Sequence, residues 1–332
     1  IEAENNIIKL IANDLEIGIE TVIEGQIVEE GNVAIGAKVF SDIIRKLPSE
    51  QVEISVNENY QLFIKCGKAK FNIAAKPTDE FPYLPQIVKE KHVEISQFTL
   101  KDIIRQTVFS ISDNENTKVM TGELFEITAN KLKVVSLDGH RISIRNVELN
   151  NSYDNISVII PGKTLIEINK ILNGGVDDIV KIYFTDKHIL FEFESTVVLS
   201  RLIEGEYYKI DKMLSSDYET KITVNKKEML DSIDRTTLLM KEAEKKPVII
   251  DIKDNSMGLA MNSSIGSMDE EIDAVKEGKD ILIGFNPRFL IDALRVIDDE
   301  EITLYMINPK APCFIRDKDE SYIYLILPVN FN

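Results

Sequence analysis

The one short cluster whose residue types suggest catalysis is the Asp-Gly-His-Arg segment at positions 138–141. A carboxylate close to an imidazole can serve in general acid–base catalysis, here with Asp138 paired to His140. The same segment also suits a tight turn between two strands, in which the glycine adopts a positive φ. Segments about one repeat away, 13–16 and 262–264, keep turn-forming residues but have no histidine. We therefore expect a turn with a binding role, and acid–base catalysis stays open as an alternative.

No other cluster has the spacing of a cofactor or metal site. The Gly-Lys-Thr segment at 162–164 resembles the end of a phosphate-binding loop, but that loop needs a glycine where the chain has Ser157. The three histidines are His92, His140 and His188, and each lacks a second His or Cys at ligand spacing. The sequence therefore predicts no cofactor and no metal ion.

A stripe of basic, acidic and basic residues occurs three times at an interval of 125 residues. Its members are spaced i, i+4 and i+7, which places them on one side of a helix. Apolar residues on the other side recur at the same interval, as Phe40, Leu165 and Leu290 do. The three copies of the stripe are Lys38, Asp42 and Arg45; Lys163, Glu167 and Lys170; and Arg288, Asp292 and Arg295.

A single stripe of this kind is usually a solvated helix face with a salt bridge. Three copies in register indicate an internal repeat with three helices in equivalent positions. The predicted helical segments 37–47, 97–107, 162–172, 225–236 and 286–297 together carry a net charge of +5, so the remainder of this chain of net charge −17 carries −22. The helices are thus a basic subset of an acidic protein, as a surface that faces a polyanion requires.

The interval between the stripes is the size of a domain, and 332 residues are enough for three domains. We expect domain I at 1–92, domain II at 93–214 and domain III at 215–332. A complete repeat reads as two helices and about eight strands, which predicts an α+β fold. The first repeat lacks its leading helix, which fits a missing N-terminal stretch.

The helices and strands follow from the periodicity of apolar residues. Helices are expected at 37–47, 97–109, within 158–172 after a short strand, at 226–239 and at 287–297. Strands are expected at 7–12, 16–24, 51–57, 61–66, 70–75, 123–129, 131–137, 141–149, 180–184, 188–194, 196–202, 302–306, 312–316 and 322–327.

The sequence also indicates a compartment. No apolar run approaches the roughly 18 residues of a membrane helix, and the first residues do not read as a signal peptide. Cys66 and Cys313 each fall inside a strand-like run, and two such cysteines do not suggest a disulfide framework. We expect a cytoplasmic protein with no membrane partner.

The three repeats, the helix stripes, the segments LDGHRISI and IGFNPRFLIDAL and the closing LILPV together resemble the bacterial DNA polymerase III beta subunit, the replication sliding clamp. The resemblance covers the whole chain. It implies a homodimer joined head to tail into a ring, with helices lining the hole and sheets forming the outer wall. Double-stranded DNA would pass through the ring without sequence-specific contacts, and the protein would be a processivity factor rather than an enzyme.

The resemblance also implies a pocket between the second and third domains that binds short linear peptides. These would come from the DNA polymerase III alpha subunit, the clamp loader and other replication and repair proteins. Carried over to this sequence, the pocket residues are Met120, Leu137, His140, Arg141, Ile142, Tyr208, Lys212, Met213, Pro312, Leu325, Leu327, Pro328 and Val329. The residues expected to face DNA are Lys38, Arg45, Lys101, Arg105, Lys118, Lys163, Lys170, Arg288 and Arg295.

This sequence departs from the family pattern at two pocket residues and in its last three residues. Tyr208 and Lys212 stand where a proline and an arginine are common, and Asn330, Phe331 and Asn332 stand where the family often ends with an arginine and an apolar residue. Two other interpretations stay open: a clamp-like scaffold that binds peptides without encircling DNA, and an acid–base enzyme. The basic stripes favour a ring over the scaffold, and the absence of a second catalytic constellation in the sequence weighs against the enzyme.

Overall fold

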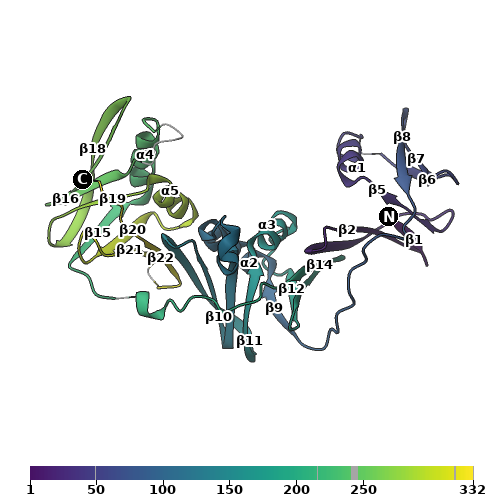
Figure 1. Cartoon of the computed structure of the whole chain (residues 1–332), viewed down its shortest axis with the longest axis horizontal. Coiled ribbons are helices and arrows are strands. Elements are labelled where there is room, and N and C mark those ends of the chain that lie inside the picture. The colour runs from purple at the N-terminus through teal and green to yellow at the C-terminus, as the bar shows by residue number, and fades with distance from the viewer. Residues whose placement is uncertain (49, 215, 241–245, 318, 332) are drawn as a thin grey trace. The chain divides into compact units, whose positions relative to one another are not determined.

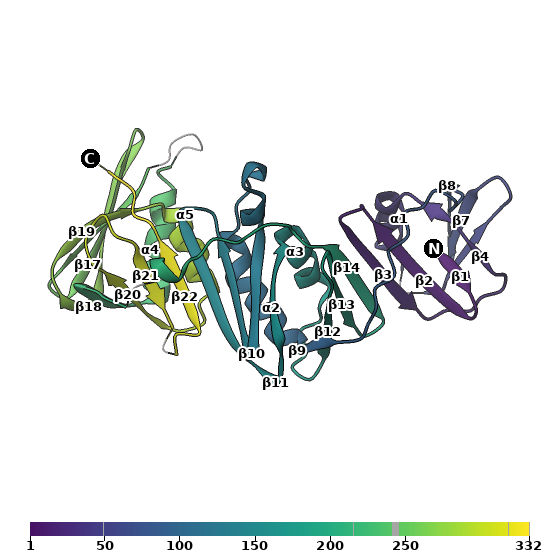
Figure 2. The same ribbon diagram turned by 60° about the horizontal axis from the view of Figure 1, so that its bottom comes forward.

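The computed structural model describes residues 1–48, 50–214, 216–240, 246–317 and 319–331. Residues 215 and 332, the expected limits of the third domain, lie outside this part. The described chain has five α-helices among many more strands, so the predicted α+β class is confirmed. It forms two compact units, Ile1–Val93 with Val180–Arg201, and Glu94–Ile179 with Leu202–Asn332. They are called unit 1 and unit 2 below, and Figures 1 and 2 show their elements.

Unit 1 is built on an eight-stranded sheet of order β4-β1-β2-β3-β14-β13-β12-β9. Its strands are β1 (Glu2–Glu4), β2 (Ile7–Asn13), β3 (Ile17–Ile23), β4 (Gly31–Asn32), β9 (His92–Ser96), β12 (Ile179–Phe184), β13 (His188–Phe193) and β14 (Thr196–Arg201). The antiparallel pair β3–β14, with Ile19 opposite Val198, joins strands of the first and second repeats. The sheet therefore runs across the expected boundary between two repeats.

A four-stranded sheet of order β5-β8-β7-β6 completes unit 1. Its strands are β5 (Ala34–Ile35), β6 (Val52–Val56), β7 (Gln61–Cys66) and β8 (Ala69–Lys76). Helix α1 (Ala37–Ile44) lays Phe40, Ile43 and Ile44 against a small core of Val33, Leu62 and Ile64. None of the α1 residues is itself fully buried. The charged side of the helix therefore faces away from this core.

Unit 2 is built on a ten-stranded sheet of order β10-β11-β22-β21-β20-β15-β18-β17-β16-β19. Its strands are β10 (Gly122–Leu137), β11 (Arg141–Pro161), β15 (Thr220–Asn225), β16 (Val248–Lys253), β17 (Ser256–Ser263), β18 (Gly266–Gly278), β19 (Ile281–Phe285), β20 (Glu301–Met306), β21 (Cys313–Arg316) and β22 (Tyr322–Ile326). The pair β11–β22 joins the second repeat to the third, with Ile142 opposite Leu325.

Two strand assignments from the sequence are wrong. The strand expected at 141–149 and the short strand expected before the helix within 158–172 are both part of β11. Residues 123–129 and 131–137 were expected to be separate strands, but β10 runs through both of them. The pairing with β11 shifts register on either side of Ala129, which has a φ of 53°. The extra residues lie on β11, because four steps along β10 from Ile127 to Lys131 correspond to eight steps along β11. The irregularity does not end β10, so the polar residues near Ala129 do not mark a turn.

Four helices pack on the sheet of unit 2: α2 (Gln97–Thr107), α3 (Gly162–Ile171), α4 (Lys226–Thr237) and α5 (Pro287–Val296). The side chains of Ser96, Asn225 and Asn286 cap the N-termini of α2, α4 and α5. Each helix buries an apolar face, as α5 does with Leu290 and Leu294, and presents its charged face away from the sheet. None of the described helices is long and apolar enough to cross a membrane.

Candidate functional site

The Asp-Gly-His-Arg segment forms the turn between β10 and β11. Asp138 Oδ1 accepts hydrogen bonds from the backbone N–H groups of His140 (2.9 Å) and Arg141 (3.1 Å), and Oδ2 accepts one from Arg141 Nε (2.9 Å). Gly139 has a φ of 89°, which confirms the predicted positive φ. The carboxylate is therefore engaged in holding the turn together, whereas the His140 side chain is exposed beside Phe289.

Arg141 fastens this turn to the rest of unit 2. Its Nη1 donates to Asp292 Oδ2 of α5 (2.7 Å), and its Nη2 donates to the carbonyl oxygen of Phe109 (2.6 Å). The guanidinium also lies 4.2 Å from the centre of the Phe289 ring, a cation–π distance. The residue is only 8% exposed. We therefore infer that Arg141 positions the turn, and that His140 is the member of the segment available to a ligand.

Apolar residues of the expected peptide pocket gather beside the turn. Leu137 lies opposite Ile142, and Ile142 lies opposite Leu325, so β10, β11 and β22 bring them into one row. Met120, in the short helix η2 (Glu115–Thr121), packs against the same cluster. Sequence reasoning missed other members of this cluster, among them Tyr207, Ile210, Leu214 and Phe314. The continuous apolar run at 313–315 in β21 could have indicated Phe314, which lies opposite Leu325.

Other pocket residues leave large side chains in solvent next to this cluster. Met213 is 52% exposed and Tyr208 is 44% exposed, and Lys212 is exposed beside them in the short helix η3 (Asp211–Met213). Pro312, just before β21, is half-buried. An apolar floor bordered by exposed Met and Tyr side chains suits an adaptable contact with a peptide.

The C-terminal residues of the expected pocket are attached to the turn and to β19. The backbone N–H of Leu327 donates to the carbonyl oxygen of His140 (2.8 Å), which ties the end of β22 to the turn. The N–H of Val329 donates to the carbonyl oxygen of Gly284 on β19 (2.8 Å). Leu327 and Val329 keep exposed side chains, and Pro328 between them is half-buried.

The basic stripes occupy exposed helix faces. Lys163 and Lys170 are exposed on α3, Arg288 and Arg295 are exposed on α5, and Lys118 is exposed on η2. In unit 1, Lys38 is exposed on α1 and Arg45 is exposed at its C-terminus. Lys170 pairs with Glu167 at 2.8 Å and Arg295 with Asp234 at 3.4 Å. Exposed pairs of this kind contribute little to stability, so these cations can exchange their partners for phosphate groups.

Lys101 has a structural contact instead. Its Nζ donates to the carbonyl oxygens of Asn169 (3.1 Å) and Leu172 (2.8 Å) at the end of α3. A helix leaves its last four carbonyls without intrahelical partners, and a cation is favourable there. Lys226 of α4 makes the equivalent contact with Ile297 at the end of α5, at 2.6 Å. In both pairs, the first helix thus caps the C-terminus of the second.

Arg105 links α2 to the end of α5. Its Nη1 donates to the carbonyl oxygen of Val296 (2.9 Å) and its Nη2 to Asp298 Oδ2 (2.8 Å). Burial acts to lower the pKa of Arg105, but Asp102 and Asp298 outweigh it and raise that pKa. That Lys101 and Arg105 face DNA remains a prediction, and these contacts do not favour it.

The structure contains a buried carboxyl group, that of Glu123, which was not among the residues singled out from the sequence. Glu123 is fully buried, with Oε2 3.0 Å from Thr107 Oγ1. The Thr107 hydroxyl donates to Glu123 Oε2 and also lies 2.8 Å from the carbonyl oxygen of Ile103. Burial raises the pKa of Glu123 well above its usual value, although the bond from Thr107 acts to lower it.

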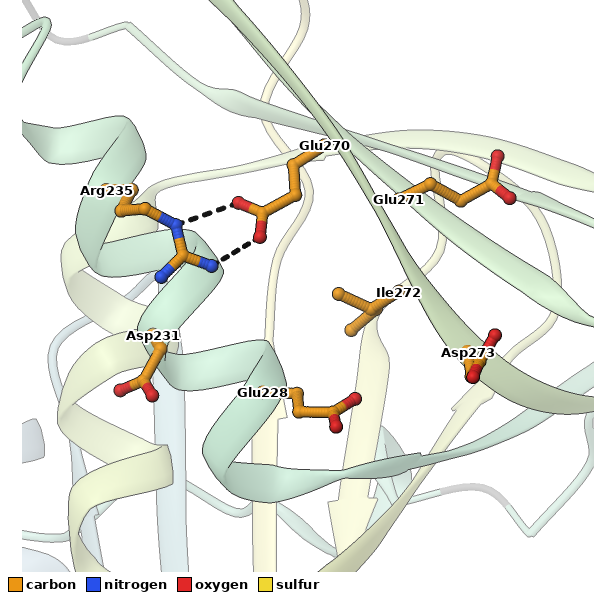
Figure 3. Close-up of a pocket in the computed structure, with 7 residues that line it drawn as sticks. All are labelled: Glu228, Asp231, Arg235, Glu270, Glu271, Ile272 and Asp273. Atoms are coloured by element: carbon orange, nitrogen blue, oxygen red, sulfur yellow. Dashed lines mark hydrogen bonds and ion pairs between the residues drawn. The ribbon is translucent and has the colours of Figure 1, made fainter.

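An acidic pocket of about 340 Å³ lies between α4 and β18 (Figure 3). It is lined by Glu228, Asp231, Arg235, Glu270, Glu271, Ile272 and Asp273. Arg235 Nε donates to Glu270 Oε2 at 2.9 Å, and a second bond joins Arg235 Nη2 to Glu270 Oε1. These bonds lower the pKa of Glu270. The described residues contain no group of carboxylates, histidines and cysteines that could hold a metal ion.

Comparison with known proteins finds three consecutive domains of one protein family along this chain. Residues 1–85, 94–209 and 211–330 match the N-terminal, central and C-terminal domains of the DNA polymerase III beta subunit. The beta sliding clamp of Staphylococcus aureus is 34% identical over 340 residues, which cover 99% of this chain and 90% of that protein. A crystal structure assigned as a DNA polymerase III beta subunit from Eubacterium rectale has 61% identity and a TM-score of 0.94, covering 100% of this chain and 90% of that one. The DNA polymerase sliding clamp of Bacillus subtilis has 34% identity and a TM-score of 0.92, with the same coverage.

Proposed function

This chain belongs to the DNA polymerase III beta-subunit family of sliding clamps, and we propose that it forms a homodimeric ring that encircles double-stranded DNA and tethers the replicative polymerase. The family membership confirms the resemblance seen in the sequence and the three-domain clamp fold. It makes the protein a processivity factor rather than an enzyme. The domain limits 1–92, 93–214 and 215–332 are part of the proposal.

The observation that carries the proposal is the exposure of basic residues at one register on three repeated helices. The basic side chains are exposed while the apolar helix faces pack against their cores, fully buried on α3 and α5 and partly buried on α1. They are Lys38 on α1 and Arg45 at its C-terminus, Lys163 and Lys170 on α3, and Arg288 and Arg295 on α5. Flexible cations of this type contact phosphates without reading bases. A ring would retain DNA by enclosing it, so each contact can stay weak and the ring can slide.

Two open strand edges provide surfaces for joining subunits. In unit 1, β8 pairs with β5 only at Ala75 and Lys76, so among the described strands its earlier residues pair with β7 alone. In unit 2, β18 pairs with β15 only from Ala274 onward, so within the described chain its residues 266–273 pair with β17 alone. Unpaired N–H and C=O groups at such edges favour pairing with another strand.

The charges of these two edges are complementary. Lys68 and Lys70 are exposed at the start of β8, and Glu271 and Asp273 are exposed on β18 beside the acidic pocket. Phe71 adds an exposed aromatic side chain to the β8 edge. We expect β8 of one subunit to pair with β18 of the other. Because the two surfaces differ, the contact is head to tail, and two such contacts close a ring.

The cluster beside the β10–β11 turn is the site proposed for partner peptides. Its floor of Leu137, Ile142 and Leu325 and its exposed border of Tyr208 and Met213 fit a short apolar peptide with a few polar contacts. The expected partners are the DNA polymerase III alpha subunit, the clamp loader and other replication and repair proteins. Replication takes place in the bacterial cytoplasm, which is where we expect the protein.

Retention on DNA of different topology tests the proposal. After loading by a clamp loader, a ring should stay on nicked circular DNA and leave the same DNA within seconds to minutes once it is cut to a linear form. Blocking both linear ends with bound protein should restore retention. Equal and rapid loss from circular and linear DNA would favour a peptide-binding scaffold that does not encircle DNA.

A further inference from the structure

The chain's last described residues, 327–331, form a segment that we call the tail. The tail leaves β22 and reaches β19, which is the last strand of the ten-stranded sheet and has β16 as its one neighbour among the described strands. Figure 1 shows the C-terminal end of the chain beside β16 and β19. The hydrogen bond from the N–H of Val329 to the carbonyl oxygen of Gly284 attaches the tail to the free edge of β19.

Gly284 leaves the space in which the tail lies. Side chains alternate along β19, so Ile283 and Phe285 point into the core while Leu282 and Gly284 belong to the opposite face. Leu282 is 45% exposed, whereas Gly284 is buried because the tail covers it. A Cβ atom at Gly284 would lie 2.5 Å from Phe331 Cδ1 and 2.9 Å from the carbonyl oxygen of Val329. Both distances are shorter than real contacts of a Cβ atom.

The need for glycine at this position is one of space and not of backbone conformation. Gly284 is absent from the described glycines with a positive φ, so alanine could adopt its backbone angles. What alanine would disturb is the position of the Phe331 ring and of the Val329 backbone. Gly258, on β17 of the same sheet, differs in this respect, because a Cβ atom there would meet Asp251 at 3.6 Å or more, an ordinary contact.

We propose that Gly284 is a positioning residue for the peptide pocket, which acts by letting Phe331 pin the tail against β19. The tail carries Leu327, Pro328 and Val329, three residues of the proposed pocket, and begins beside the β10–β11 turn. It is held at one end by the bond from Leu327 to His140 and at the other by the bond from Val329 to Gly284. A segment fixed in this way needs no ordering when a peptide binds, which favours affinity. The inference rests on the proposed peptide-binding function.

The test compares the substitution G284A with the matched control G258A. Amide hydrogen exchange at Val329 and trimming of the chain end by carboxypeptidase report whether the tail is attached. A titration with a labelled peptide from the C-terminus of a DNA polymerase III alpha subunit measures the affinity of the pocket for a partner peptide. We expect G284A to speed exchange at Val329 about tenfold or more and to weaken the peptide several-fold, with β16 still protected. G258A should match the wild-type protein in all three measurements.

A second variant tests the ring directly. F331A leaves Gly284 unchanged and removes the ring that pins the tail, so it should also speed exchange at Val329 and weaken the peptide, with β16 still protected. Wild-type protection and affinity in G284A would overturn the inference, and so would equally fast exchange throughout β16 and β19. If the wild-type protein does not bind the peptide, the proposed pocket is wrong, while exchange at Val329 still decides whether Gly284 holds the tail.

Discussion

Arg141 Nη1 donates a hydrogen bond to Asp292 Oδ2 across 2.7 Å, which joins the β10–β11 turn to the basic stripe of α5. Asp292 is the acidic member of that stripe, between Arg288 and Arg295. Because Arg141 neutralises it, the exposed face of α5 is more positive than its three charges suggest. The contact also links two surfaces of unit 2, the one proposed for DNA and the one proposed for peptides.

Replacing Arg141 should therefore destabilise unit 2 more than an ordinary surface substitution would. The substitution R141M leaves Asp138 and Asp292 without their cation in a largely buried site, and we expect a loss of about 2–4 kcal/mol in the free energy of unfolding. R141K keeps the charge but cannot make the same forked set of bonds, so it should fall in between. Urea denaturation measures both, with R201K as a control at an exposed arginine of unit 1. An R141M protein as stable as the control would show that the contact contributes nothing.

Charge reversal of the stripes should impair loading and processive synthesis while the fold persists. The variant carries Glu at Lys38, Arg45, Lys163, Lys170, Arg288 and Arg295, which are exposed. Each phosphate contact that is lost should reduce the salt dependence of binding to duplex DNA by about 0.9 in the log–log slope. The matched control reverses six exposed lysines outside the helices, Lys91, Lys131, Lys187, Lys253, Lys279 and Lys310. Equal processivity of the two variants would show that the stripes are solvated helix faces with no specific role in DNA binding.

Reversing the charges of β8 or of β18 tests whether these two strands join the subunits. The variant K68E/K70E should shift the dimer toward monomer in sedimentation velocity, because like charges would meet across the proposed strand pair. The variant E271K/D273K should also shift the dimer toward monomer on its own. An equal mixture of the two variants should form a dimer with one subunit of each, because opposite charges then meet at both contacts. A wild-type protein that is monomeric at micromolar concentration would count against the ring itself.

Glu123 should make stability depend on pH. Its pKa is raised by burial, so the folded state keeps a proton that the unfolded state releases above pH 4.5, the ordinary pKa of the group. Unfolding is then favoured as pH rises, by about 1.4 kcal/mol per pH unit until the pKa of the folded state is passed. E123Q removes this titration, so its stability relative to the wild-type protein should increase as the pH rises above 4.5. E126Q, on the same strand with a partly exposed side chain, should track the wild-type protein.

Replacing the Leu327 side chain by alanine should weaken peptide binding without affecting the dimer. L327A removes an exposed anchor from the tail, and we expect a loss of about 1–3 kcal/mol in binding free energy. L282A removes a similarly exposed leucine on β19 that no bond connects to the turn, and it serves as the control. The measurement is the same peptide titration, and equal affinities of the two variants would place the pocket elsewhere.

Local features of this protein could be predicted from the sequence because they depend on neighbours along the chain. The spacing of Lys163, Glu167 and Lys170 predicted a charged helix face, and Pro287 in the first turn predicted the start of α5. Gly139 predicted a turn with positive φ, and the structure has one. The repetition of these patterns at 125 residues indicated three repeats, and together with the segments LDGHRISI, IGFNPRFLIDAL and LILPV it suggested the family.

Only the tertiary structure decided which charged and apolar groups are free to bind. Lys101 belongs to an amphipathic helix like the other predicted DNA-facing cations, but its ammonium group caps α3, 68 and 71 residues further along the chain. Arg141 likewise meets a partner 151 residues away, and Gly284 meets the ring of Phe331. Periodicity reports the side of a helix or strand on which a residue lies, because that depends on backbone geometry alone. Which distant carbonyl, carboxylate or ring it then meets depends on how strands and helices pack, and no local pattern carries that information.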